Sequence, residues 1–301
     1  PEAVLNVKAH MRIRTILLQQ SSVKSLTFLG DMFDGVQCPC ILLQLVATGK
    51  PLSTVGMRIE DRTRTFIIAM ERTVVPENFS FRMTDEEYRV LEKIKNSIPV
   101  CYLADHADFA LGIVTGNNKK FLSAEKTEHS EMVLKGTDIC KYHINPAKQY
   151  LRFEPEQFQQ VAPLEIYRAP EKLLYRFISN QLVVAYDDRQ MLSLNSCNIV
   201  IPKIEGMQIK YILAILNSSV SQFVYQKEFH SIKVLRAHME HIPIPRVGKA
   251  IQNEIIAMTE PLICGMGKEA AETCQKRLDC RIMDLFRLSA EEQWIIRHAL
   301  H

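Results

Sequence analysis

Residues 210–224 show the clearest hydrophobic pattern in the chain. Their apolar residues recur at steps of three and four, which places them on one face of a helix. These residues are Ile212, Leu213, Leu216, Val220, Phe223 and Val224. The chain then becomes basic and reaches Pro243 and Pro245, which cannot donate a backbone hydrogen bond. We therefore expect a buried helix, a basic turn and an extended segment at a sheet edge.

The first 96 residues predict two helices and three strands. Residues 1–20 carry an apolar stripe that predicts a helix. Three strands are predicted to follow, at residues 23–29, 40–47 and 63–70. The 40–47 run is almost continuously apolar, which is typical of a strand covered on both faces. Residues 84–96 predict a connecting helix, because Thr84 and Glu87 have the spacing of a capping box.

The middle of the chain alternates short strand-like runs with turn residues, which predicts a compact β module. Its predicted segments are residues 112–121, 135–139, 164–168, 172–177, 182–186 and 199–201. Residues 251–288 again repeat apolar residues at helical spacing. Ser289 and Glu292 form a second capping-box pattern, which predicts a short last helix.

Composition is that of a globular protein, with 47% hydrophobic and 24% charged residues among 301. A net charge of +3 is too small to indicate nucleic-acid binding by the chain as a whole. Residues 203–250, however, hold seven Lys or Arg against three Glu, a local excess of +4. We therefore expect any basic surface to be local.

The eight cysteines form no dense framework, so we expect reduced, mostly buried thiols in a cytoplasmic protein. No apolar run reaches the ~18 residues that a membrane span needs, and no signal peptide opens the chain, so no membrane partner is expected. The chain begins at Pro1 without a methionine. We expect it to be a piece of a longer polypeptide.

Catalytic chemistry is weakly represented. Asp105, His106 and Asp108 could chelate a metal, but a solvated cluster is the preferred interpretation. Asp187 and Asp188 follow a predicted strand, yet no lysine follows at the spacing of a nuclease site, so a structural turn is preferred. No serine or cysteine lies in a nucleophile motif. We predict no catalytic residue and no metal site, and a nuclease or metal hydrolase ranks last among the hypotheses.

The turn at residues 117–120 suggests contact with DNA. Asparagine can pair with adenine, and lysine with guanine or phosphate. An ordinary hairpin turn would have a similar sequence and stays an alternative.

Several stretches, in order along the chain, together resemble one family. They are residues 1–6, 13–14, 29–33, 38–45, 112–118 with Phe121, 135–139, 216–218, 229–233, 242–245 and 278–292. The family is that of adenine-N6 DNA methyltransferases of restriction–modification systems, including type IIG enzymes. The chain resembles the tail of the methyltransferase fold followed by a TaqI-like C-terminal specificity domain.

This resemblance implies a mixed fold, α+β with an α/β part. A truncated Rossmann-like methyltransferase sheet would precede a β-rich target-recognition domain and C-terminal helices. The expected parts are the methyltransferase tail at 1–82, a connector helix at 83–104, the target-recognition domain at 105–250 and a helical segment at 251–301.

The family's Asn/Asp-Pro-Pro-aromatic loop and its S-adenosylmethionine glycine motif are both missing from the sequence. The resemblance therefore implies no cofactor in this fragment and S-adenosylmethionine for a longer parent, which would methylate DNA only as a whole. The implied partners are double-stranded DNA and the missing N-terminal catalytic domain of the same polypeptide.

The resemblance and the local positive charge together assign the candidate site residues. The base-edge candidates are Thr115, Asn117 and Asn118. The phosphate candidates are Lys119, Lys120, Lys135, Lys227, Lys233 and Arg236. The structural motif residues are Gly112, Gly116, Gly136, Asp138, Asn217, Pro243 and Pro245. The alternative hypothesis is a protein–protein interaction module of a multisubunit restriction–modification or phage-defence complex.

Overall fold

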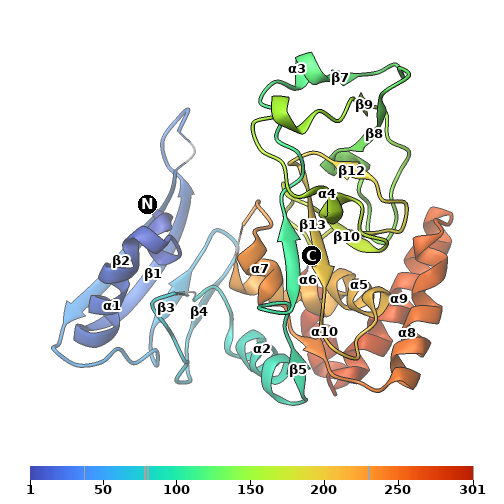
Figure 1. The fold of residues 1–301 in the computed structure, drawn as a ribbon. Coiled ribbons are helices and arrows are strands. Elements are labelled where there is room, and N and C mark those ends of the chain that lie inside the picture. The colour runs from blue at the N-terminus through green and yellow to red at the C-terminus, as the bar shows by residue number, and fades with distance from the viewer. Residues whose placement is uncertain (37, 78, 80, 230, 301) are drawn as a thin grey trace. The chain divides into compact units, whose positions relative to one another are not determined.

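A computed structural model describes residues 1–301 except 37, 78, 80, 230 and 301 (Figure 1). The chain divides into two compact units, residues 1–90 and 91–301, and each is described by itself. Helix α2 (Asp85–Asn96) crosses the division. Its capping box forms as predicted: Thr84 N donates to Glu87 Oε2 at 2.9 Å, and Glu87 N donates to Thr84 Oγ1 at 3.3 Å.

The first unit is a small mixed sheet with short helices. Its elements are η1 (Glu2–Leu5), η2 (Lys8–His10), α1 (Met11–Gln20), β1 (Ser21–Asp31), β2 (Pro39–Ala47), β3 (Arg58–Glu60) and β4 (Thr65–Ile67). The strand order is β2-β1-β3-β4. Strands β1 and β3 run parallel, and the other two pairs are antiparallel. The α-helix predicted over residues 1–20 thus begins at Met11, and two 3-10 turns precede it.

Arg14 explains why these turns hold together. Its side chain is 1% exposed, and its guanidinium donates to the carbonyls of Val4 and Val7, both at 2.8 Å, and to that of Pro76. Burial lowers the pKa of Arg14, and Glu77 opposes that shift. One buried cation therefore links carbonyls of the two turns to that of Pro76, and the Val7 carbonyl also accepts from His10 N at 3.0 Å within its own turn.

Strand β2 departs from the prediction that both its faces are covered. Among the described residues it pairs with β1 alone, and Leu42, Leu45 and Val46 are 60%, 42% and 50% exposed. A continuous apolar run indicates a strand that needs cover on both sides, but it does not say which part of a protein supplies that cover.

The second unit combines three small sheets with a set of helices. Its strands are β5 (Val100–Cys101), β6 (Ala107–Ala110), β7 (Leu122–Ser123), β8 (Glu131–Leu134), β9 (Tyr150–Leu151), β10 (Lys172–Arg176), β11 (Val184–Asp187), β12 (Leu192–Ser193), β13 (Cys197–Pro202) and β14 (Ile244–Pro245). Its helices after α2 are α3 (Asn118–Phe121), η3 (Gly136–Asp138), η4 (Pro155–Gln157), α4 (Leu164–Tyr167), α5 (Ile209–Asn217), α6 (Ser219–Glu228), α7 (Arg236–Glu240), α8 (Lys249–Ile263), α9 (Lys268–Leu285) and α10 (Ala290–Ala299). Figure 1 shows the β-rich part leading up to α3, with the red C-terminal helices gathered at the other end.

The sheets are ordered β11-β10-β13-β6, β12-β8-β9-β7 and β14-β5. A core of fully buried residues, including Ile113, Leu174, Ala185 and Ile199, joins the first two sheets. The predicted β module is therefore present. Residues 164–168 are an exception, because they form the short helix α4 instead of a strand.

The helix predicted from residue 210 is two helices. Ser218 separates α5 from α6, and its Oγ accepts a hydrogen bond from Ser221 N as the N-cap of α6. The buried face is as expected, since Ile212, Leu213 and Phe223 are fully buried.

Two amides fix these helices to the sheet. Asn217 is fully buried; its Oδ1 accepts from Val184 N at 3.1 Å and its Nδ2 donates to Val184 O at 2.8 Å. Gln222 makes the same pair of bonds with the backbone of Leu182, at 2.9 and 3.0 Å. Asn217 therefore has the structural role that the sequence predicted.

Pro243 and Pro245 lie in an extended segment, as the sequence predicted. Pro243 and Pro245 are buried, and β14 pairs with β5, so the segment is extended. Tyr211 Oη donates to Pro245 O at 2.9 Å, which anchors this short sheet to α5. At the end of the chain, Ser289 caps α10 with Glu292, as predicted.

These features confirm the predicted fold class, a mixed α and β protein with small sheets and C-terminal helices. All eight cysteines are free. Only two of them, Cys101 and Cys197, are buried, so the expectation of mostly buried thiols is wrong. Among the described residues, no helix combines the length and apolarity needed to cross a membrane.

Candidate nucleic-acid interface

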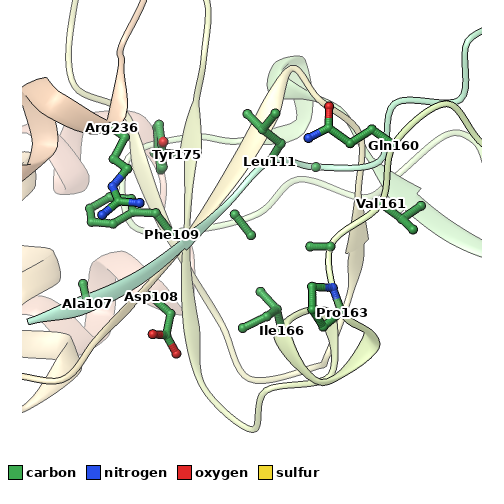
Figure 2. Close-up of a pocket in the computed structure, with 13 residues that line it drawn as sticks. Ala107, Asp108, Phe109, Leu111, Gln160, Val161, Pro163, Ile166, Tyr175 and Arg236 are labelled. Atoms are coloured by element: carbon green, nitrogen blue, oxygen red, sulfur yellow. The ribbon is translucent and has the colours of Figure 1, made fainter. Parts of the chain in front are cut away.

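A groove of about 660 Å³ runs along β6 and is lined on its far side by residues 160–163 and Ile166 (Figure 2). Phe109 and Tyr175 provide aromatic surface, and Arg236 of α7 closes one end. Successive strand residues point to opposite faces, so Phe109 faces Arg236 while Asp108 points away from it. The groove thus combines an aromatic surface, a cation and an amide, Gln160.

Backbone pairing and one buried tyrosine hold the two walls. Val114 and Gln160 exchange backbone hydrogen bonds of 2.9 and 3.1 Å. The fully buried Tyr167 accepts from Ala162 N at 3.1 Å and donates to Leu111 O at 3.3 Å. The width of the groove is therefore set by main-chain contacts and not by flexible side chains.

Gly112 lies in the wall of the groove, where no side chain fits. A Cβ atom built on it would be 2.1 Å from Leu194 O and 2.7 Å from Cys197 O. Its backbone N–H donates to Oδ1 of the buried Asn198 at 3.3 Å. The prediction of a structural glycine at 112 thus has a physical reason, the close approach of two backbones.

Arg236 is exposed and available for contacts. Its guanidinium carbon lies 5.2 Å from the centre of the Phe109 ring, and Nε is 2.7 Å from Glu240 Oε1. An exposed pair at this helical spacing contributes about 0.3–0.5 kcal/mol, so a phosphate could compete for the guanidinium.

His238, on the same helix, is stacked on Phe229 with ring centres 4.4 Å apart and accepts from Leu235 N at 3.2 Å. Burial, followed by the nearby His241, lowers the pKa of His238 to about 4. It is therefore neutral at pH 7 and helps to hold α7, so the positive charge at this end of the groove comes from Arg236.

The turn before α3 holds itself together through its own polar side chains. Thr115 Oγ1 donates to Asn118 Oδ1 at 2.6 Å and accepts from Asn117 N at 3.2 Å. Asn117 Oδ1 accepts from Lys120 N at 3.2 Å as the N-cap of α3. Gly116 has φ +77°, in the region that favours glycine.

This geometry separates the three base-edge candidates. Thr115 is 4% exposed with its hydroxyl engaged in the turn, which argues against the prediction that it contacts a base. Asn117 and Asn118 are exposed. The phosphate candidates Lys119 and Lys120 are exposed as well, and Lys120 Nζ lies 4.6 Å from the centre of the Phe121 ring.

The Lys135–Asp138 motif is a folded turn. Asp138 Oδ2 accepts from Lys135 N at 2.8 Å, and a Cβ at Gly136 would lie 2.5 Å from Ser196 O. Arg176 donates to the carbonyls of Gly136 and Ile139 at 2.9 and 2.5 Å. Gly136 and Asp138 thus have the structural roles expected of them, and Lys135 is half-buried.

The remaining cations differ sharply in exposure. Lys233 is exposed beside α7, on a segment that pairs with Ile178. Lys227 is 6% exposed, with Nζ 5.9 Å from the centre of the Phe223 ring. Its burial contradicts the prediction that Lys227 contacts phosphate, because α6 turns this residue into the core.

The acidic candidates have structural partners. Asp187 and Lys172 are both fully buried and form an ion pair of 2.6 Å, and Asp187 also accepts from Arg189 N and Met191 N at 2.9 Å. This confirms a structural turn. Asp108 pairs with Lys203 at 2.5 Å. In the described part of the chain, no three His, Cys, Asp or Glu side chains are grouped so that they could hold a metal.

The comparisons with known proteins agree with this arrangement. Residues 131–244 match the family model of the TaqI-like C-terminal specificity domain. This part of the chain is similar to TaqI-like specificity domains. The matched residues include Lys135, Gly136, Asp138, Gln160, Tyr175, Asn217, Lys233, Arg236 and Pro243. The resemblance expected from the sequence is confirmed over these residues. The search of curated proteins found no match.

The chain also resembles solved structures of restriction–modification proteins. The type IIL enzyme MmeI, determined in complex with DNA, matches 99% of this chain with a TM-score of 0.60 at 9% identity. The chain covers 48% of MmeI, about half of its length. The type IIG endonuclease BpuSI and the HsdS subunit from Thermoanaerobacter tengcongensis match with TM-scores of 0.43 and 0.36, at 11% and 13% identity. These matches cover 100% and 72% of this chain, and 45% and 50% of theirs. The MmeI match shows a shared fold.

Sequence reasoning missed the aromatic residues of the groove. Phe109 and Tyr175 lie on different strands, and they meet Arg236 because β6 and β10 both flank β13. One error could have been avoided: Lys227 is four residues after Phe223, on the buried face of the helix.

Proposed function

We propose that this chain is the DNA target-recognition module of a restriction–modification enzyme. The observation that carries the proposal is the specificity-domain match over residues 131–244, which includes two exposed cations, Arg236 of the groove and Lys233 three residues before it. The MmeI likeness over nearly the whole chain supports it.

The arrangement suits contact with duplex DNA. Lys233 and Arg236 lie at the α7 end of the groove, and the chain continues from β6 through Gly112 to the exposed Lys119 and Lys120 of α3 (Figure 1). Phosphate contacts by such cations fix the register of a protein on DNA without reading its sequence. Asn117, Asn118 and Gln160 are exposed amides that could pair with base edges between these contacts.

The parent enzyme is proposed to be an adenine-N6 methyltransferase that uses S-adenosylmethionine. This part of the proposal rests on the sequence resemblance alone. The residues of this chain supply no glycine-rich cofactor turn, so no catalytic step is assigned to them. Digesting DNA treated with the whole enzyme to nucleosides and identifying the methylated base by mass spectrometry would test it; methylated cytosine would refute it.

The exposed face of β2 favours a protein partner as well. Leu42 and Val46 form an exposed apolar surface on one face of an edge strand, which proteins normally cover, and Leu45 is exposed on the opposite face. We propose that the catalytic domain of the same polypeptide covers it. If a separately produced catalytic domain bound equally well to the chain and to its Leu42→Ser/Val46→Ser variant, this assignment would be wrong.

DNA binding can be tested with fluorescence anisotropy on a random-sequence duplex at several salt concentrations. Replacing Lys233 and Arg236 by glutamine should weaken binding and reduce the slope of log K against log salt by about 2, since each phosphate contact contributes about 0.9. The matched control is Lys268→Gln/Arg277→Gln, which removes one exposed lysine and one exposed arginine from α9. Equal slopes for the two double variants would refute the role of the α7 region.

A further inference from the structure

A second cavity, of about 650 Å³, lies between residue 141 and helices α6, α9 and α10. Its lining includes Lys141, Ser219, Lys276, Asp279 and Arg297. Among the described residues, none that lines the DNA groove also lines this cavity. The specificity-domain match and the DNA-binding proposal therefore leave it without a function.

The cavity contains more positive than negative groups. Lys141 Nζ donates to Asn217 O at 3.2 Å, and burial lowers the pKa of Lys141 while Asp279 raises it. Asp279 accepts from Ser219 N at 2.8 Å, at the start of α6, and burial raises the pKa of its carboxyl. Lys141 and Asp279 thus largely offset one another.

The other two cations that line the cavity are Lys276 and Arg297. Arg297 Nη2 reaches Gln293 Oε1 at 3.0 Å, Cys280 Sγ at 3.4 Å and Met283 Sδ at 3.9 Å. Sulfur atoms are weak acceptors. Within the residues that the structure describes, no carboxylate is placed within ion-pair distance of either Lys276 or Arg297. An incoming anion would therefore meet two basic groups without an acidic partner.

Three buried donors near the cavity make no hydrogen bond of good geometry among the described residues: Ser219 Oγ, Gln275 Nε2 and Tyr142 Oη. They are nevertheless grouped around one acceptor, since the side chains of Ser219 and Gln275 both lower the pKa of the Asp279 carboxyl and Gln275 also interacts with Tyr142 Oη. Tyr142 is 2% exposed and has φ +74°, an uncommon backbone conformation for a bulky residue.

A smaller hollow of about 360 Å³ adjoins this site and shares Lys141 and Lys276 with it. Tyr142, Leu262, Met266 and Ala271 make much of its wall apolar, and His143, Glu272 and Gln275 add polar groups to it. A basic compartment and an apolar compartment thus meet at the same two lysines. Each of the two spaces, about 650 and about 360 Å³, is within the range of about 300–1,000 Å³ that holds small ligands.

We propose that this site binds a small organic anion. Its oxyanion group would lie between Lys276 and Arg297, and its apolar body would occupy the hollow beside Tyr142. Two cations without an ion-paired carboxylate favour a negatively charged group, and phosphate, sulfonate or carboxylate has that chemistry.

Isothermal titration of the full chain with phenyl phosphate, without DNA, tests the proposal, and phenol serves as the uncharged counterpart. Phenyl phosphate should bind with a Kd of about 1 mM, a strength within reach of a ligand of this size. Lys276→Gln/Arg297→Gln should weaken binding at least tenfold, whereas Lys268→Gln/Arg277→Gln should leave it unchanged.

Three outcomes would overturn the proposal: no binding up to about 20 mM phenyl phosphate, equal binding of phenol, or equal effects of the two double variants. The first would leave the cavity as a water-filled space. If Lys276→Gln/Arg297→Gln fails to fold, Lys276→Gln alone keeps the test decisive, because its side chain is exposed and its loss should weaken binding about threefold.

Discussion

Gly112→Ala is expected to destabilise the second unit severely while adding a single methyl group. The new Cβ would lie 2.1 Å from Leu194 O and 2.7 Å from Cys197 O, both backbone atoms. Real Cβ atoms approach other atoms to about 3.0 Å at the closest, so one backbone segment must move by about 1 Å. Leu194 and Cys197 are 2% and 0% exposed, so this movement would disturb packed core. Overpacking of this kind costs about 1–3 kcal/mol and occasionally more, and we expect about 3 kcal/mol because no side chain can yield.

Urea unfolding followed by tryptophan fluorescence measures this cost, because Trp294 is the single tryptophan and lies in the second unit. With a slope of about 2–3 kcal/mol per molar urea, the midpoint should fall by roughly 1 M. Gly248→Ala is the control. It adds the same methyl group at the N-cap of α8, where no atom lies within 4 Å, and should cost about 0.5 kcal/mol. A Gly112→Ala midpoint within about 0.2 M of the unmodified chain would refute the close-approach argument.

Three further predictions concern the same unit. Asn217→Ala should cost about 2–3 kcal/mol in urea unfolding, because it leaves the N–H of Val184 buried without an acceptor, and a loss below about 0.5 kcal/mol would contradict this. Lys172→Met should cost about 3–5 kcal/mol, since it leaves the Asp187 carboxylate buried without its cation, and a thermal midpoint equal to that of the unmodified chain would be the contrary result. Folding lowers the pKa of His238 from 6.5 to about 4, so the folded unit binds fewer protons than the unfolded one over that range. The stability that the neutral imidazole contributes should therefore be complete above pH 6.5 and be lost as the pH falls towards 4. His238→Phe should flatten this part of the pH profile, and a profile of unchanged steepness would exclude His238 as its source.

Local patterns predicted local structure well. The capping boxes at Thr84 and Ser289 form because each needs only residues three apart, and Pro245 ends in an extended segment because its ring fixes the backbone. The glycines of the motifs, Gly112 and Gly136, both lie where a Cβ atom would meet a backbone oxygen. What sequence could not provide was the reason, which is a carbonyl oxygen from residues 194–196 in contact with each of them.

Properties that depend on distant neighbours were predicted less well. Strand β2 was expected to be covered on both faces, but several of its apolar side chains are exposed. An apolar run shows that a strand suits a buried position, and it does not show that this chain buries it. Lys227 and Lys233 both belong to one basic run, yet helical phase buries the first and a change of backbone direction exposes the second. The groove itself joins Phe109, Tyr175 and Arg236, whose meeting is decided by strand order, and a single sequence carries little information about strand order.

The paired amides of Asn217 and Gln222 have a consequence for how this sheet could grow. Asn217 and the backbone of Tyr142, which exchanges hydrogen bonds with Val184 and Tyr186, occupy outer hydrogen-bonding groups of β11, and Gln222 pairs with Leu182 just before that strand. When the hydrogen-bonding groups at one edge of a sheet are occupied, a further strand can pair only with the opposite edge. In the sheet β11-β10-β13-β6, the opposite edge strand is β6, which borders the groove. An extended backbone from another molecule could add to this sheet beside Phe109, so strand addition and groove occupancy would exclude each other.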